Sequence, residues 1–507
     1  MSEPEGRGAA WNEERGTSDE GGQRSEGGMG RRAGPRRRAG DTGGPAGRAF
    51  PPAGLPRLIL PGGPLPLAGH LTRYGPVPFR DARAMGGAPR PSPGGLIAEI
   101  ERAGLTGRGG AGFPAGRKMR AVAEAGRRSR PLHSQVAAVV VANGTESEPA
   151  SGKDRLLLTQ APHLVLDGIA LAAEAVGATR GYLSLHAGED ELSLQLAAAI
   201  TERERGGLNR VPIQVVAVPG GYVASQETAL VSYLNGGPPK PAFVPPRPFQ
   251  KGAHGRPTLV QNVETLAHIA LIARFGAEWF REMGSAAAGS ALVTVSGAVR
   301  RPGIYEIALD MPVGDLLHQA GGPSETPQAI LAGGYFGGWL RYDQALDVPV
   351  SDPALRTVGA TLGPGVLVLL PESACGLAET ARIAAYLAGQ SAGQCGPCLN
   401  GLPALAGTLG QLAFGRPDAR ALGSAEQLLG LVARRGACHL PDGTAAFVAS
   451  SLRAFGSELR RHASSGPCPR VRRRPVLPAP GFAEPGRAVP AYTGPGHAGP
   501  GRTGERS

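Results

Sequence analysis

The stretch VAAVVVANGTESEP, residues 136–149, joins a short apolar run to a polar, acidic segment. The run 136–142 is entirely apolar and lies between polar residues, which is typical of a strand buried on both faces of a sheet. In α/β proteins, ligands bind beyond the carboxyl ends of such strands. The acidic segment is therefore either a solvated loop or a binding loop, and its clustered carboxylates favour a binding loop.

The neighbouring sequence continues this alternation of strands and helices. A helix is expected over residues 162–176, and further strands are expected over 181–187 and 213–218. Strands that alternate with helices predict an α/β domain with a mostly parallel sheet, which we assign to residues 56–250.

The character of the sequence changes after this domain. Residues 291–307, ALVTVSGAVRRPGIYEI, place β-branched residues around a turn-forming segment, which predicts a hairpin. This hairpin is the start of a compact module that we assign to residues 251–345. Residues 346–465 contain a linker strand and then a helical pattern, which predicts a helical bundle. The two ends, 1–55 and 466–507, are poor in large apolar residues and are expected to be disordered tails.

The net charge of +12 does not predict nucleic-acid binding. Seven Arg against two Glu place +5 of this excess in the basic tail 466–507, and no helix carries a basic stripe interleaved with aromatic residues. Five cysteines, an odd number with uneven spacing, argue against a disulfide framework. The polar N-terminus and the lack of a long unbroken apolar stretch predict a cytoplasmic protein without a membrane span.

Three further segments are candidate ligand loops. Residues 106–116, TGRGGAGFPAG, can bring backbone N–H groups close to a planar or phosphorylated ligand, although a lone glycine motif that follows a helix is a weak signal. Residues 219–230, PGGYVASQETAL, supply a second glycine pair before a predicted helix. Residues 255–268, GRPTLVQNVETLAH, place Gln261 and Asn262 before a helix whose N-terminus can hold a phosphate.

In this order, the four segments resemble the FMN-bearing flavoprotein subunit of respiratory complex I and the diaphorase subunits of NAD-linked hydrogenases and formate dehydrogenases. The family pattern GRGGAGFPTG, NADESEPG…KDR, a GEET-type loop and NNVET corresponds here to GRGGAGFPAG, NGTESEPASGKDR, SQETA and QNVET. The resemblance covers residues 65–462. It implies an α/β fold with a Rossmann-like FMN-binding domain, a β-grasp module of the soluble-ligand-binding type and a C-terminal helical bundle that carries an iron–sulfur site.

The resemblance implies an FMN-dependent oxidoreductase that takes electrons from NADH or NADPH and passes them through an iron–sulfur cluster. The implied partner is an iron–sulfur subunit or another redox protein, and the location can be peripheral to a membrane complex. The implied catalytic residues are Glu148 and Glu227. The implied cofactor-binding residues are Gly107, Arg108, Gly109, Gly110, Gly112, Phe113, Lys118, Asn143, Glu146, Ser147, Tyr222, Asn262 and Thr265.

The implied cluster lacks one protein ligand. The family motif S-C-G-x-C-x-x-C reads SAGQCGPC at residues 391–398, so Ala392 stands where the first cysteine is expected. A four-iron cluster takes four ligands, usually thiolates. The site could hold a 3Fe–4S cluster, or a 4Fe–4S cluster completed by water or His439, or it could be empty. C-x-x-C alone also fits a redox dithiol or a zinc site. The implied metal ligands are Cys395, Cys398 and Cys438.

Other departures weaken the expected NADH site more than the FMN site. Thr145 replaces the family's aspartate, Arg247 replaces a phenylalanine, and Met119 and Ala121 stand where the family has aromatic residues. Each lost stacking face should weaken NADH binding by about 1 kcal/mol. These departures suggest a divergent paralogue, and the rival interpretation is a non-catalytic relative that acts as a binding or scaffold subunit.

Two cysteines remain outside the implied cluster. Cys375 follows an expected strand and is predicted to be a buried apolar thiol, whereas Cys468 lies in the predicted tail and is expected to be an exposed thiol. Neither is assigned a function by the resemblance.

Overall fold

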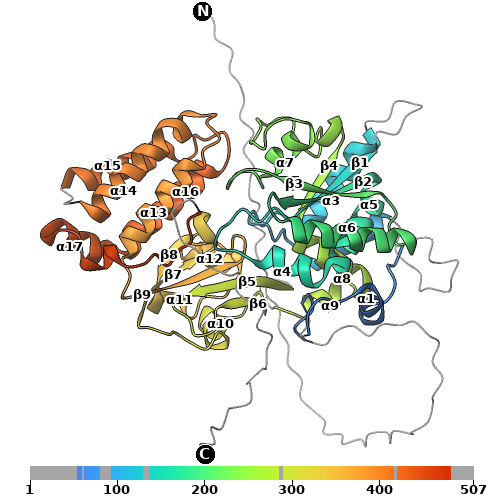
Figure 1. The fold of residues 1–507 in the computed structure, drawn as a ribbon, viewed down its shortest axis with the longest axis horizontal. Helices are drawn as coiled ribbons and strands as arrows, with labels where there is room; N and C mark the ends of the chain where they lie inside the picture. Colours follow the sequence, from blue (N-terminus) through green and yellow to red (C-terminus); the bar gives the residue numbers. More distant parts are fainter. Residues whose placement is uncertain are drawn as a thin grey trace, which may run out of the picture. The chain divides into compact units, whose positions relative to one another are not determined.

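The computed structural model describes residues 54–59, 62–79, 93–128, 137–284, 289–415 and 419–480, which all belong to one compact unit (Figure 1). The predicted disorder of residues 1–53 and 481–507 lies outside the described residues.

The first part of the described chain is an α/β domain around a four-stranded parallel sheet of order β3-β2-β1-β4. The predicted parallel sheet is therefore confirmed, and its fourth strand lies beyond the boundary that we expected at residue 250. Its elements are α1 (Leu67–Tyr74), α2 (Pro93–Ala103), α3 (Ala115–Arg128), β1 (Ala138–Asn143), α4 (Lys153–Gln160), α5 (Pro162–Val176), β2 (Ala178–His186), α6 (Asp190–Arg205), β3 (Ile213–Val218), α7 (Glu227–Leu234), η2 (Ala253–Gly255), β4 (Thr258–Asn262), α8 (Val263–Phe275) and α9 (Ala277–Arg281).

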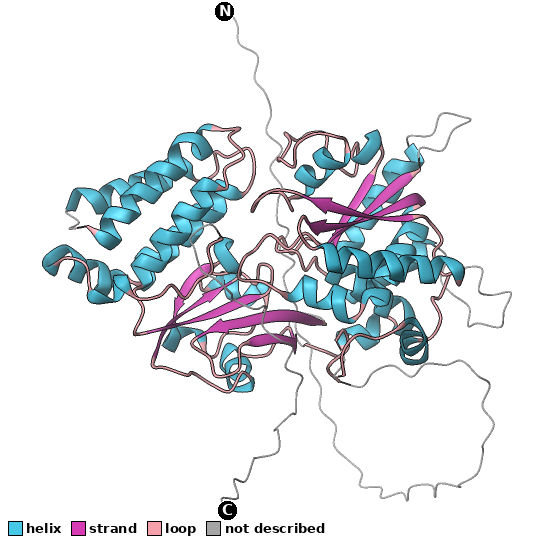
Figure 2. Ribbon diagram, viewed as in Figure 1, coloured by secondary structure: helices cyan, strands magenta, loops and turns pink. Residues whose placement is uncertain are grey.

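Both faces of this sheet are buried, which explains the unbroken apolar run of β1. The strands of this sheet lie among helices (Figure 2). Val140 and Ala142 face a large core that includes α5 and α8, whereas Val139 and Val141 face a smaller core that includes α7. Within the described residues, no single helix is long and apolar enough to cross a membrane. Only the pair α4 and α5 passes that test together, and the two helices are bent by 95° relative to each other.

The strand order places a switch point between β1 and β4. The chain runs outward from β1 through β2 to β3 and then returns to pair β4 with the other edge of β1. Asn143 at the end of β1 is in register with Asn262 at the end of β4. Connections on either side of such a point leave in opposite directions, which opens a crevice at the carboxyl edge of the sheet.

The second part is a five-stranded mixed sheet of order β6-β5-β9-β7-β8. Its helix α10 packs on one face and the C-terminal helices pack on the other. The β-grasp expectation agrees with this sheet, but the central strand β9 lies well beyond residue 345. Its elements are β5 (Ser290–Gly297), β6 (Gly303–Ala308), α10 (Val313–Gln319), β7 (Pro327–Ala332), η3 (Gly334–Phe336), β8 (Gly338–Arg341), α11 (Tyr342–Ala345), α12 (Asp352–Thr357) and β9 (Val366–Pro371).

The third part is the predicted helical bundle. It consists of α13 (Gly376–Gly389), η4 (Pro397–Gly401), α14 (Leu402–Phe414), α15 (Ala419–Val432), α16 (Leu440–Ala454), α17 (Gly456–Ser465) and η5 (Pro469–Arg472). Of these, η4 is a single π-helical turn that contains the C-x-x-C motif's second cysteine.

The prediction of a disordered tail from residue 466 is wrong for residues 466–480. Leu477 is buried in the core of the bundle, and the backbone N–H groups of Val476 and Leu477 donate hydrogen bonds to Glu379. Arg470 forms an ion pair with the buried carboxylate of Glu458, at 2.8 Å. Because this segment has few apolar residues, its sequence pattern did not predict the contacts that attach it to the bundle.

A buried charge cluster joins four helices of the α/β domain. Asp167 on α5 is fully buried, and its carboxylate lies 2.7 Å from His70 of α1, 2.6 Å from Arg203 of α6 and 2.5 Å from Arg274 of α8. Burial alone would raise the pKa of Asp167, but Arg274, His70 and Arg203 hold it below its usual value. The carboxylate is therefore ionised and fixes the helices that support the sheet.

Replacement of Asp167 by alanine is expected to lower the free energy of unfolding by about 3–5 kcal/mol, because it leaves buried guanidinium groups without a counter-charge. Asp343→Ala is the matched control, since the pair that Asp343 makes with Arg341 is exposed and such pairs contribute about 0–1 kcal/mol. Urea unfolding of both variants measures the difference. Equal losses in the two variants would show that the buried cluster has no special role.

Candidate functional site

The glycine loop 107–112 lies against the end of β4 and the first turn of α8. A Cβ atom on Gly109 would lie 3.2 Å from the Cβ atom of Asn262, and the backbone N–H of Arg108 donates to Thr265 Oγ1 at 2.9 Å. Gly110 has a φ of 114°, which side chains rarely adopt. Close approach to Asn262 therefore favours glycine at position 109, and the backbone conformation favours it at position 110.

The two strand ends at the switch point are tied to each other. Asn262 donates from Nδ2 to Asp154 at 2.6 Å and to the carbonyl of Asn143 at 3.4 Å, while its Oδ1 accepts from the N–H of Glu264 and caps α8. Asn143 donates to the carbonyl of Ser225, in the loop after β3. Three segments that are distant in the sequence thus meet at one edge of the sheet.

Lys118 and Glu227 form an ion pair across this edge. Their charged atoms lie 2.8 Å apart, and both side chains are partly exposed, so they can contact a ligand. Gln261, one residue before the end of β4, is buried, and its Nε2 has no hydrogen-bond partner among the described residues. A buried donor of this kind needs a ligand or water, because leaving it unpaired costs about 1–3 kcal/mol.

Glu146 and Ser147 have local roles in the acidic loop. Glu146 accepts hydrogen bonds from the hydroxyl of Ser151 and from the backbone N–H groups of Asp154 and Arg155, so it caps the start of α4. Burial and the neighbouring Asp154 raise the pKa of Glu146 to about 7. The Ser147 hydroxyl donates to the carbonyl of Thr145 at 3.4 Å.

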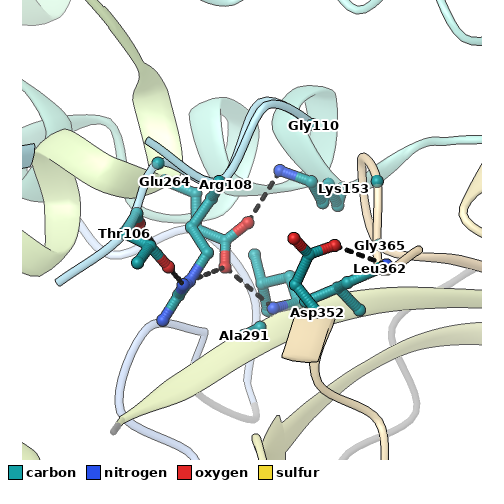
Figure 3. Close-up of a pocket in the computed structure, with 13 residues that line it drawn as sticks. Thr106, Arg108, Gly110, Lys153, Glu264, Ala291, Asp352, Leu362 and Gly365 are labelled. Atoms are coloured by element: carbon teal, nitrogen blue, oxygen red, sulfur yellow. Dashed lines mark hydrogen bonds and ion pairs between the residues drawn. The ribbon is translucent and has the colours of Figure 1, made fainter. Parts of the chain in front are cut away.

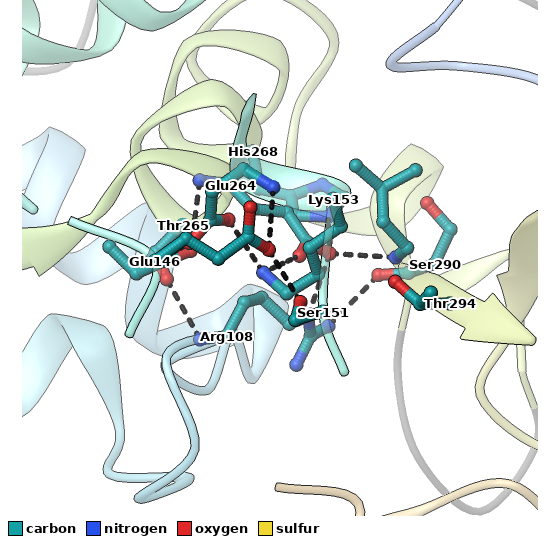
Figure 4. Close-up of polar contacts among 12 residues, drawn as sticks. Arg108, Glu146, Ser151, Lys153, Glu264, Thr265, His268, Ser290 and Thr294 are labelled. Carbon is teal, nitrogen blue, oxygen red and sulfur yellow. Dashed lines mark hydrogen bonds and ion pairs between the residues drawn. The ribbon is translucent and has the colours of Figure 1, made fainter. Parts of the chain in front are cut away.

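Behind the loop lies a buried network of charged groups (Figure 4). Glu264 accepts a hydrogen bond from Lys153 Nζ at 2.7 Å and another from the backbone N–H of Leu292 at 2.9 Å. The Arg108 guanidinium lies 3.9 Å from the same carboxylate and donates to the carbonyl of Ser290 at 3.1 Å. Burial opposes ionisation, but Lys153 and its neighbours hold the pKa of Glu264 at about 2. The Arg108 side chain therefore anchors the loop to β5.

A small pocket opens beside this network (Figure 3). Its lining includes Arg108, Lys153 and Glu264 together with Asp352 and Leu362 of the second part, and it includes none of Lys118, Asn143, Tyr222 or Glu227. Gly107, Arg108, Gly110 and Gly112 also line it, so the pocket lies against the glycine loop and contains only this part of the predicted flavin residues. Asp352 accepts from the N–H of Leu362, and a Cβ atom on Gly112 would lie 3.2 Å from its carboxylate.

Glu148 lies where the three parts of the chain meet. It is buried, and its Oε2 accepts hydrogen bonds from the Tyr222 hydroxyl and from the Tyr335 N–H, each at 2.8 Å. Burial raises the pKa of Glu148 to about 7, although these donors act in the opposite direction. The N–H of Tyr222 in turn donates to Gln390, just before the cysteine motif, at 2.8 Å.

Three cysteines gather at one end of the helical bundle. Cys398 is buried, whereas Cys395 and Cys438 are half-buried. Burial and the thiols of Cys395 and Cys438 raise the pKa of Cys398 to about 11. Burial acts to raise the pKa of Cys395 as well, but hydrogen bonds from the backbone N–H groups of Ala437 and Cys398 lower it overall and favour the thiolate that metals bind.

The motif position at which the family carries its first cysteine holds a methyl group in this chain, that of Ala392. Ala392 is buried, and the side chain of His439, one alternative ligand, is exposed. The Ser391 hydroxyl lies within hydrogen-bonding reach of the Cys398 thiol. The group therefore offers three of the four thiolates that a four-iron cluster usually takes.

The structure brings together residues that the sequence analysis selected separately. The pairs are Lys118 with Glu227, Arg108 with Thr265, Gly109 with Asn262, Asn143 with Asn262, and Glu148 with Tyr222. No described contact joins the half-exposed ring of Phe113 to this group. The sequence analysis did not select Lys153 or Gln390 as site residues, because their partners Glu264 and Tyr222 lie far away in the sequence. It also missed Ser391, whose partner Cys398 lies in the same motif.

Three family models match the chain. They are the Nuo51 FMN-binding domain over residues 100–271, the SLBB domain over 292–335 and the NADH-ubiquinone oxidoreductase-F iron-sulfur binding region over 374–462. Their order follows the three parts of the fold.

Curated relatives are similar over most of their length. The F subunit of NADH-quinone oxidoreductase from Mycobacterium tuberculosis (strain ATCC 25618 / H37Rv) is 31% identical over 423 residues, which are 80% of this chain and 92% of the relative. The Escherichia coli (strain K12) protein of the same name is 32% identical over 325 residues, which are 62% of this chain and 71% of the relative.

A solved structure agrees with these relatives. The NAD⁺-reducing NiFe hydrogenase in the H₂-reduced state matches with a TM-score of 0.67 and 30% identity, over 75% of this chain and 63% of that chain. This chain thus spans less than two thirds of the hydrogenase chain. The chain belongs to the family of NADH-quinone oxidoreductase F subunits, the flavoprotein subunits of complex I.

Proposed function

We propose that this protein is an FMN-dependent NADH oxidoreductase subunit that passes electrons through a three-cysteine iron–sulfur site to a partner redox protein. The observation that supports it best is the meeting of the glycine loop, the β1 and β4 ends and the Lys118–Glu227 pair at the switch point of a parallel sheet. A partner iron–sulfur subunit and a cytoplasmic location remain predictions from the sequence.

FMN would lie against Gly107, Gly109 and Gly110, whose backbone can approach a planar or phosphorylated ligand. The unpaired Gln261 amide and the Lys118 ammonium would donate hydrogen bonds to it. When bound, FMN supplies the two-electron oxidation of NADH and the release of electrons one at a time. The other proposed contacts are those implied by the family, at Asn143, Glu146, Ser147, Tyr222, Glu227, Asn262 and Thr265.

A route from this site to the cysteine group follows from the contacts of Tyr222. Its hydroxyl donates to Glu148, and its N–H donates to Gln390, which directly precedes the motif that begins at Ser391. The loop after β3 therefore contacts both Glu148, an implied catalytic residue, and the segment that leads to the proposed cluster. Such continuity keeps the two redox sites at a fixed separation.

A non-catalytic scaffold is the second candidate, and the observation that favours it is the buried methyl group of Ala392 in place of a ligand. The two candidates predict different spectra. Protein purified without oxygen should show flavin bands and a broad iron–sulfur shoulder that NADH bleaches. A colourless protein that takes up neither FMN nor a reconstituted cluster would establish the scaffold instead.

The variant Lys118→Met tests the flavin site directly. Loss of a charge-assisted hydrogen bond worth about 1.5–3 kcal/mol should weaken FMN binding by roughly 10- to 100-fold. Fluorescence titration of deflavinated protein with FMN measures this change. The exposed Lys240→Met is the control and should bind FMN like the wild type. If both variants bind equally, Lys118 is not a ligand.

Glu148 should give stability and activity a pH dependence near neutrality. Its folded pKa of about 7 lies above the ordinary value of 4.5, so its contribution to stability is present at low pH and is lost as the pH rises through 7. Relative to Glu148→Gln, the wild type should lose about 3 kcal/mol of unfolding free energy between pH 5 and pH 8.

Urea unfolding at the two pH values measures this difference. Tyr222→Phe removes a donor to the carboxylate and should move the inflection to higher pH. If Glu148 lies in the nicotinamide site, the same inflection appears in kcat/KM for NADH and disappears in Glu148→Gln. A difference between wild type and Glu148→Gln that does not change with pH would refute the assignment.

Ala392→Cys should complete the cluster. Iron content is expected to rise from about three to about four atoms per chain, and the magnetic signature of a three-iron cluster should be lost. Ala388→Cys, on the preceding turn of α13, is the control and should leave both unchanged. Iron analysis and electron paramagnetic resonance decide the outcome. Unchanged iron in Ala392→Cys would mean that the fourth position does not face the cluster.

A further inference from the structure

The two cysteines outside the proposed cluster lie together in the structure, although the chain separates them by 93 positions. Ligand atoms of Cys375, Glu458, His462 and Cys468 all lie within 4.8 Å of one another. The first three residues are buried, and Cys468 is half-buried. The expectation of an incidental exposed thiol at Cys468 is therefore wrong.

We propose that these four side chains form a mononuclear zinc site that is separate from the iron–sulfur site. Two thiolates, one imidazole and one carboxylate are a donor set that Zn²⁺ takes with tetrahedral geometry. Cys375 Sγ and His462 Nε2 are 3.9 Å apart. This is close to the distance of about 3.5 Å that separates a sulfur ligand from a nitrogen ligand in a tetrahedral zinc site. The thiols of Cys375 and Cys468 lose their protons to solvent when the ion binds.

The imidazole is held in the form that a metal needs. His462 Nδ1 lies 3.2 Å from the carbonyl of Leu412, which can only accept, so Nδ1 carries the proton. Its Nε2 then carries a lone pair, which lies 3.9 Å from Cys375 Sγ and accepts a hydrogen bond from the backbone N–H of Cys468 at 3.2 Å. A bound ion would take the place of this hydrogen bond. A backbone carbonyl that fixes a histidine in this way is the usual outer contact of a metal-bound imidazole.

The carboxylate and one thiol are also oriented by neighbouring groups. Glu458 accepts from the N–H of Gly376 at 3.1 Å and from Arg470 at 2.8 Å, while Cys375 Sγ accepts from the N–H of Ala378 at 3.4 Å. Cys375 thus caps the N-terminus of α13, while burial and the Glu458 carboxylate raise the pKa of its thiol. Arg470 balances the excess negative charge of two thiolates and a carboxylate.

The site cannot supply the missing ligand of the cluster. Cys375 precedes α13, whereas Ala392 and Cys395 follow it, and a helix of this length spans about 20 Å. The proposed zinc therefore joins the start of α13, the helix α17 and the segment 466–472. It would hold the C-terminal segment on the bundle at the end opposite the cluster.

The test uses the full-length chain with Cys395, Cys398 and Cys438 changed to serine, so that cluster cysteines cannot bind the ion. This reference protein should retain about one Zn²⁺ per chain by metal analysis. With Co²⁺ it should show the intense visible bands of a tetrahedral site and a thiolate charge-transfer band. Adding Cys468→Ser or His462→Gln should weaken Zn²⁺ binding at least tenfold, whereas the exposed His318→Gln should not change it.

A second measurement leaves the three proposed cluster cysteines in place. In the wild-type chain, Zn²⁺ should slow alkylation of Cys468, measured by peptide mass mapping, and His462→Gln should abolish this protection. The proposal is overturned if Zn²⁺ leaves Cys468 alkylation unchanged, or if anaerobically purified protein contains a Cys375–Cys468 disulfide and takes up no metal. Neither readout depends on FMN or NADH, so failure here leaves the proposed oxidoreductase function standing.

Discussion

The buried ion pair between Lys153 and Glu264 is the interaction on which the arrangement of the flavin domain depends. Lys153 begins α4, Glu264 lies in the first turn of α8, and the second oxygen of Glu264 accepts from β5 of the next sheet. Arg108 joins the same carboxylate to the glycine loop. A buried pair of this kind gives little net stability, yet removal of either partner leaves a charge without compensation. The network therefore fixes where the loop lies relative to the sheet more than it stabilises the fold.

Much of the architecture could be predicted from the sequence because it depends on local patterns. The apolar run at β1 predicted a strand buried on both faces, and Val139 and Val140 do face different cores. The position of β9 could not be predicted in this way, since a strand's neighbours in a mixed sheet are set by long-range pairing. The apolar segment 366–370 looked like a linker strand, whereas β9 lies between β5 and β7. The segment 466–480 was misjudged because its order rests on a few contacts, such as that of Leu477.

The candidate site likewise combines residues that motifs predicted with residues that only tertiary contacts identify. Lys118, Glu227, Asn143 and Asn262 were selected from motifs, and the sheet topology brings them to one edge. Lys153 belongs to the quoted KDR segment, but its contact with Glu264, like that of Gln390 with Tyr222, joins residues more than 100 positions apart and could not be predicted from either segment. The sequence did not predict that the Arg108 side chain points toward β5. An arginine within a glycine-rich motif is instead expected to bind an anionic ligand. Motifs thus predict which loops matter, and tertiary contacts decide what each side chain does.

The distribution of cysteines along the bundle follows from the geometry of one helix. Because α13 separates Cys375 from the motif that begins at Ser391, thiols at its two ends cannot share an ion. The chain has lost a thiol at one end, at Ala392, and carries two thiols at the other, at Cys375 and Cys468. The second group meets a histidine whose tautomer is already fixed by the carbonyl of Leu412. If that end binds zinc, the ion supplies a rigid attachment for a segment that has few apolar residues of its own. The bundle that carries an incomplete cluster would then be stabilised independently of that cluster.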